Sequence, residues 1–92
     1  MEKSIHVVIK GRVQGVWFRG WTIREANQLG LSGWVKNNKN GNVEALFSGP
    51  SDKVDTMINA CWMGPKNANV NKITKTSSLP PLTTAFSQLP DT

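Results

Sequence analysis

Apolar and polar residues alternate near the start of the chain, as they do in a strand with one buried face. Over residues 4–13, Ile5, Val7 and Ile9 fall on the same side of the chain. Gly15 interrupts this pattern, and glycine adopts positive φ at no steric cost. The pattern therefore predicts a strand that ends in a tight loop.

Residues 18–29 show helical spacing instead. Ile23, Ala26 and Leu29 recur every three residues, which places them on one side of a helix. Gly30 follows directly, at the position where a glycine often ends a helix. The first part of the chain thus reads as strand, tight loop and helix.

A second helix is predicted to begin at Ser51, which is suited to be its N-cap, and to end before Gly64. Asp52 and Asp55 suit the positive end of the helix dipole. Four residues with spacing i, i+3, i+4 and i+7 form its apolar face: Val54, Met57, Ile58 and Cys61.

Two further alternating runs, residues 31–37 and 42–48, lie between these helices. They flank residues 38–41, where the pair Asn40–Gly41 favours left-handed backbone angles. We therefore predict a β-hairpin.

Residues 69–75 are predicted as a fourth strand, and residues 83–89 as a fifth that turns Phe86 inward. The resulting order, βαββαβ, predicts an α+β, ferredoxin-like sandwich: an antiparallel sheet with two helices on one face. We expect one domain over residues 1–92, because this length supports a single core.

The loop between the first strand and the first helix is the leading candidate for chemistry. Its main-chain N–H groups, from about Gly15 to Arg19, have neither a strand partner nor a helical carbonyl before them. Curled together at a helix N-terminus, they form an anion pocket, and the planar guanidinium of Arg19 can grip two phosphate oxygens. A plain structural turn beside a surface arginine explains the same spacing equally well.

Asn37 ends the second predicted strand, and in this fold that strand end approaches the end of the first strand. Its carboxamide can accept a hydrogen bond from water and donate a hydrogen bond to a phosphate oxygen. The alternative is that Asn37 only begins the asparagine-rich turn. A phosphate cradle and one fixed carboxamide suffice to hydrolyse a phosphate that has a good leaving group.

Composition narrows the function classes. The net charge is +5 with scattered basic residues, which favours small anionic substrates over a dedicated nucleic-acid surface. One cysteine, Cys61, fits a reducing compartment, and we expect a cytoplasmic protein without a signal peptide or membrane span. One cysteine and one histidine cannot make a metal site, so neither a metal nor a cofactor is expected.

Three motifs carry a resemblance to a known family: Gly11-Arg-Val-Gln-Gly-Val-Trp-Phe-Arg19, Gly33-Trp-Val-Lys-Asn37 and Gly41-Asn-Val-Glu44. Together they resemble the signature of the acylphosphatases, and the resemblance extends over about residues 5–75. It implies this same fold and hydrolysis of carboxyl-phosphate anhydrides without a metal.

The resemblance also implies roles for individual residues. Arg19 would hold the phosphate, and Asn37 would position the attacking water. The phosphate would further be bound by the main-chain N–H groups of Gln14, Gly15, Val16, Trp17 and Phe18.

The expected partner is therefore a small acyl phosphate, and we expect a monomer because no surplus apolar stripe remains. Two other functions stay open: an anion- or nucleic-acid-binding module on the same fold, and a sensor that binds acyl phosphate without turnover.

Overall fold

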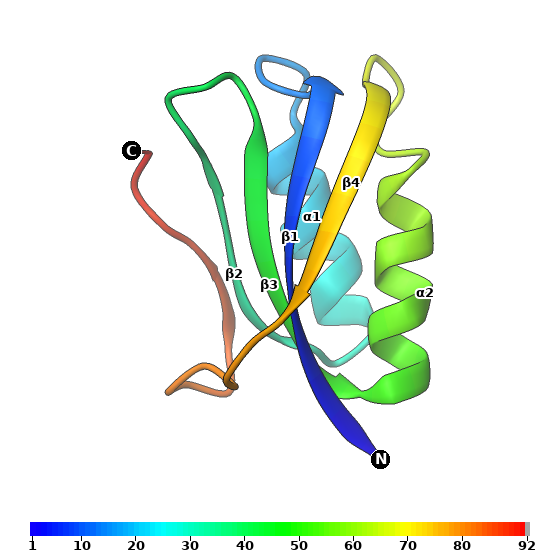
Figure 1. Ribbon diagram of the computed structural model, residues 1–92, viewed down its shortest axis with the longest axis vertical. Helices are drawn as coiled ribbons and strands as arrows, with labels where there is room; N and C mark the ends of the chain where they lie inside the picture. Colours follow the sequence, from blue (N-terminus) through cyan, green and yellow to red (C-terminus); the bar gives the residue numbers. More distant parts are fainter. Residues whose placement is uncertain (92) are drawn as a thin grey trace.

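The computed structural model describes residues 1–91, and its elements follow the predicted order (Figure 1). They are β1 (Glu2–Arg12), α1 (Phe18–Gln28), β2 (Ser32–Asn37), β3 (Val43–Pro50), α2 (Ser51–Cys61), β4 (Asn69–Ser77) and β5 (Phe86–Gln88).

The strands form one sheet in the order β4-β1-β3-β2-β5, and both helices lie on the same face of it (Figure 1). The ferredoxin-like α+β prediction is thus confirmed. Each helix connects two strands that have a third strand between them, β3 between β1 and β2, and β1 between β3 and β4.

One part of the fold prediction is wrong: the sheet is not wholly antiparallel. The pairs β1–β3, β1–β4 and β2–β3 are antiparallel, but β5 runs parallel to β2, with Gly33 opposite Phe86. The chain leaves β4 at the end of the sheet where β2 begins and crosses that end to reach the far edge (Figure 1). It therefore enters β5 in the direction of β2.

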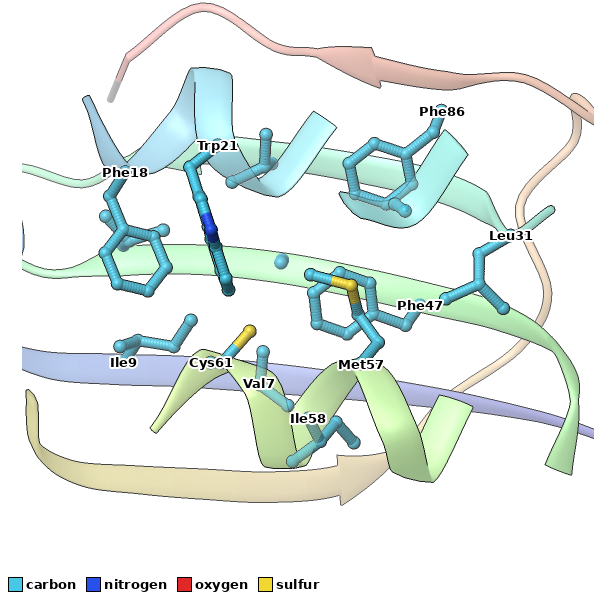
Figure 2. Close-up of a cluster of buried hydrophobic side chains, with 14 of the residues drawn as sticks. Val7, Ile9, Phe18, Trp21, Leu31, Phe47, Met57, Ile58, Cys61 and Phe86 are labelled. Carbon is cyan, nitrogen blue, oxygen red and sulfur yellow. The ribbon is translucent and has the colours of Figure 1, made fainter. Parts of the chain in front are cut away.

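The core lies between the sheet and the helices. Figure 2 shows Phe18 and Trp21 of α1, and Met57 and Cys61 of α2, in the same layer of buried side chains as Phe47 of β3. All four residues predicted for the apolar face of α2 are buried, as are Val7 and Ile9 on β1 and Phe86 on β5. The alternation of the strands therefore identified the buried face correctly.

One local prediction needs correction. Ser51 is not the N-cap of α2: it is the first helical residue, and Pro50 precedes it without a side-chain cap. Trp17 precedes α1 and Trp62 follows α2, and these two tryptophans are 59% and 48% exposed. No helix within residues 1–91 is long and apolar enough to cross a membrane.

Burial of Cys61 has a measurable consequence. Desolvation raises the pKa of its thiol from 9.0 to about 12. The native chain therefore holds this proton more tightly than the unfolded chain does. Below pH 9.0 the thiol is protonated in both the native and the unfolded chain, so its ionisation does not affect the free energy of unfolding. Above pH 9.0 the thiol ionises first in the unfolded chain, and we expect the free energy of unfolding to fall as pH rises toward about 12.

Two measurements check this expectation. Cys61→Ala should flatten the alkaline slope in urea titrations, and iodoacetamide should alkylate the native thiol far more slowly than the unfolded one. Rapid alkylation of the native protein at neutral pH would contradict the burial.

Candidate functional site

The β1–α1 loop and the β2–β3 turn lie at the same end of the molecule (Figure 1). This follows from the pairing, because β1 and β2 are both antiparallel to the β3 strand between them and therefore run in the same direction. The loop that follows β1 and the residue that ends β2 are thus brought together, as the topology predicts.

A cavity of about 190 Å³ opens between these two segments. Five of the residues singled out in the sequence line it: Gly15, Trp17, Phe18, Arg19 and Asn37. Val13, Gly20 and Gln88 complete the lining. The guanidinium of Arg19 and the carboxamide of Asn37, eighteen positions apart in the sequence, therefore belong to the same cavity.

A larger cavity of about 370 Å³ lies near the start of β1, at the other end of the sheet. Its lining includes Lys3 and Asp55, which form an ion pair with each other. Lys75 also lines this cavity, but neither Arg19 nor Asn37 does, so it is not the site predicted from the motifs. In residues 1–91, no group of three His, Cys, Asp or Glu side chains is arranged to hold a metal ion.

The N–H groups of the loop are available to a ligand. Among residues 1–91, no main-chain carbonyl accepts a well-formed hydrogen bond from the N–H groups of residues 14–20. The first such bond after β1 runs from the Trp21 N–H to the Trp17 carbonyl, at 3.0 Å. Seven successive donors thus precede or open α1, where the helix dipole favours an anion.

Phe18 holds the end of this loop in place. Its ring is buried and packs edge-on against Trp21, with the ring centroids 5.3 Å apart. It also fits against Gly64, where an added Cβ would approach Phe18 Cε2 to 2.7 Å. The loop is therefore closed by a residue of the core, which fixes where its donors point.

Asn37 differs from the other buried polar residues. Thr22 and Ser48 both bond within the protein: Thr22 Oγ1 donates to the Phe18 carbonyl at 2.8 Å, and the hydroxyls of Ser48 and Ser4 lie 2.7 Å apart. Asn37 is only 8% exposed as a residue, and its carboxamide bonds to no other described residue. Since no fully buried side-chain N or O atom in residues 1–91 lacks a hydrogen-bond partner, the carboxamide atoms reach solvent, and the cavity that Asn37 lines is where they can meet water or a ligand.

The Arg19 side chain forms an ion pair with a residue near the C-terminus. Its Nη1 donates to Asp91 Oδ1 at 2.9 Å, and both side chains are partly exposed. An ion pair at such a site contributes about 0–1 kcal/mol. The contact uses one of the five N–H donors of the guanidinium and leaves the others for a ligand.

Gln14 and Val16 do not line the cavity. Val16 is partly buried against the core. The Gln14 side chain crosses to the β2–β3 turn, where its Nε2 donates to the carbonyls of Asn38 and Asn42, each at 2.8 Å. A role for these two residues in binding phosphate therefore concerns only their main-chain N–H groups.

The Gln14 amide ties the loop to the turn that directly follows Asn37. The Asn38 side chain closes this turn from within, since its Oδ1 accepts from the N–H groups of Asn40 and Asn42 at 3.0 and 3.1 Å. We expect Gln14→Met, which removes both donors without adding a charge, to lower kcat more than it changes inhibition by inorganic phosphate.

Both carbonyls keep a main-chain hydrogen bond, Asn38 from the Gly41 N–H at 3.2 Å and Asn42 from the Asn38 N–H at 2.9 Å, so we expect kcat to fall only about three- to tenfold. Gln14→Glu is the charged companion variant, and steady-state kinetics with a phosphate inhibition series is the measurement. An unchanged kcat in both variants would show that the turn holds Asn37 without Gln14.

No pattern in the sequence pointed to Gln88 or Asp91. Gln88 reaches the cavity because β5 pairs in parallel with β2 and places it opposite Val35. Asp91 follows shortly after, and neither residue belongs to a motif. Only Gly20, a glycine inside a predicted helix, carried a local sign of a close approach.

Comparison with known proteins agrees with this architecture. The family model described as Acylphosphatase matches residues 5–87. A curated acylphosphatase of Rhodospirillum rubrum is 49% identical over 88 residues, which cover 96% of this chain and 97% of that protein. The solved acylphosphatase of Coxiella burnetii superposes with a TM-score of 0.91 at 34% identity, covering 96% of this chain and 93% of that one. The solved acylphosphatase of Bacillus subtilis superposes with a TM-score of 0.88 at 34% identity, covering 97% of this chain and 99% of that one. The motifs, the fold and the relatives agree, and the chain belongs to the acylphosphatase family.

Proposed function

We propose that this protein hydrolyses acyl phosphates to a carboxylate and inorganic phosphate in the cavity between the β1–α1 loop and the β2–β3 turn. One observation carries the proposal: Arg19 and Asn37 line that cavity together with Gly15, Trp17 and Phe18, whose N–H groups donate no well-formed hydrogen bond to a main-chain carbonyl of residues 1–91. Relatives named acylphosphatases across most of the chain support the reaction class.

The phosphoryl group is held by the loop and Arg19. The transferred group spreads its negative charge over three equatorial oxygens in the transition state. Convergent N–H groups and a guanidinium stabilise that charge, and because they are already in place they need no reorganisation. We assign the N–H donors to Gln14, Gly15, Val16, Trp17 and Phe18.

Asn37 positions the attacking water. Its Oδ1 accepts a hydrogen bond from the water, and its Nδ2 donates a hydrogen bond to a phosphate oxygen. Together these bonds align the water with the phosphorus. The bond between water oxygen and phosphorus forms as the bond to the acyl oxygen breaks, and the electron pair leaves with the carboxylate. The water proton passes to a phosphate oxygen. Since a carboxylate is a weak base, the leaving group needs no general acid.

This assignment uses neither a metal nor a cofactor. We further propose that the protein is cytoplasmic and monomeric, because it has one buried cysteine and its apolar strand and helix faces pack on each other. Size-exclusion chromatography with light scattering tests the monomer.

The test of the function is steady-state hydrolysis of acetyl phosphate, with and without EDTA. We expect turnover that the chelator does not change and competitive inhibition by inorganic phosphate. Binding of phosphate without turnover would instead identify a sensor, and a loss of turnover in EDTA would overturn the metal-free mechanism.

A further inference from the structure

Trp17 has a backbone conformation that tryptophan rarely adopts. It is the residue that precedes α1, and its φ is 68° and ψ 24° in the left-handed region. Among residues 1–91 it is the one non-glycine residue with positive φ. Left-handed angles strain a side chain with a Cβ, and such strain persists where the surrounding structure imposes it, often at a functional site.

Packing in the core does not explain why a tryptophan is present. The side chain is 59% exposed, whereas its neighbour Phe18 is buried in the core. A glycine in place of Trp17 would give the loop the same backbone angles without strain. The indole itself therefore needs an explanation beyond the shape of the loop.

The indole is nevertheless held in place. It lies against Gly20 so closely that a Cβ at that position would overlap Nε1, Cε2 and Cδ1 of the ring. On the same helix, the guanidinium carbon of Arg24 lies 5.1 Å from the ring centroid, in cation–π contact. An exposed aromatic ring that is fixed in this way is a preformed contact surface.

The ring also borders the catalytic cavity. Arg19 and Asn37 provide polar side chains to its lining, and Trp17, whose ring lies against Gly20, provides an exposed apolar one. A bound phosphate occupies the polar part, so the acyl group attached to it must extend away from the loop. Trp17 is the exposed large apolar residue among those that line the cavity.

We propose that the Trp17 indole binds the acyl group of the substrate and favours acyl phosphates with an aromatic or other flat apolar acyl group. This inference rests on the proposed function and adds the substrate class. An aromatic acyl group would contact the ring, and an acetyl group is too small to cover it. Trp17 is thus a specificity-determining residue through its side chain, separate from the role of its main-chain N–H.

The test compares kcat/KM for benzoyl phosphate and acetyl phosphate. The wild type should prefer benzoyl phosphate, and Trp17→Gly should lower the benzoyl-to-acetyl ratio about three- to tenfold, as expected for loss of one aromatic contact. Trp17→Phe should retain most of the ratio. Gly20→Ala, which displaces the indole without removing it, should lower the ratio as well and keep α1 folded, since alanine is the better helix former.

Trp62→Ala is the matched control, because Trp62 is also an exposed tryptophan at a helix end but does not line the cavity. It should leave the ratio unchanged. Equal losses for both substrates in Trp17→Gly would overturn the acyl contact and leave the hydrolase assignment intact. If the wild type hydrolyses neither substrate, the proposed function itself fails.

Discussion

Replacing Arg19 with alanine should lower kcat/KM for acetyl phosphate by about 10²- to 10³-fold, the usual effect of removing one donor to a developing oxyanion. Affinity for inorganic phosphate should fall too, because the guanidinium contacts the same charge in the bound anion and in the transition state. Arg19→Lys should recover part of the phosphate affinity and little of the rate, since an ammonium cannot form the two parallel bonds of a guanidinium.

Arg12→Ala is the control for the loss of positive charge. Arg12 lies at the end of β1, is exposed and does not line the cavity. It should change kcat/KM less than about threefold at moderate salt, since exposed charges that do not touch the ligand are largely screened. Similar losses in the two variants would indicate general electrostatic attraction instead of a specific contact by Arg19.

The contact with Asp91 affects how Arg19 meets its substrate. The carboxylate lies 2.9 Å from Nη1, so an incoming phosphate meets a guanidinium that already has one anionic partner. Because both side chains are partly exposed, the pair is weak. Phosphate can therefore share the guanidinium with Asp91 or displace it, and the contact fixes the direction of the Arg19 side chain before substrate binds.

Much of the fold could be predicted because its signals are local. Alternation in residues 4–13 and the spacing of Val54, Met57, Ile58 and Cys61 depend on which face of an element is buried, and the structure agrees at each of them. Side chains that pack on a core repeat with the period of their own element. The order of these elements then permits few arrangements, since connections are short and do not cross.

The direction of β5 could not be predicted in this way. Its three residues give almost no periodicity, and its parallel pairing with β2 depends on where the chain leaves β4. Contacts between residues far apart in the sequence have no local pattern. The same reason explains why Gln88 and Asp91, which approach the cavity from this last segment, could not be identified in advance.

The two candidate side chains of the site could be predicted from the sequence, but the contacts that support them could not. Arg19 and Asn37 lie in short motifs at the ends of two strands that the topology brings together. The destination of the Gln14 side chain could not be read from the motif, because its partners are carbonyls of the β2–β3 turn. Main-chain carbonyls are present at every residue, so the sequence does not mark which of them is used.

Asn37→Ala should separate catalysis from binding. We expect kcat for acetyl phosphate to fall by about 10²- to 10³-fold, because the water loses its fixed position and the phosphate loses one donor. Inhibition by inorganic phosphate should change less than about threefold, since the loop N–H groups and Arg19 remain. Asn37→Asp, nearly the same in shape, should lose rate and also phosphate affinity, because its carboxylate repels the anion.

Asn40→Ala is the matched control, an exposed asparagine of the same turn whose side chain does not line the cavity. It should retain kcat. A carboxamide that merely supported the turn would give a different pattern: Asn37→Ala would lower the unfolding midpoint and leave kcat near that of Asn40→Ala. A carboxamide that makes no hydrogen bond within the protein predicts the reverse, because its removal sacrifices none. Loss of rate with little loss of stability therefore distinguishes a residue that serves the ligand from one that serves the fold.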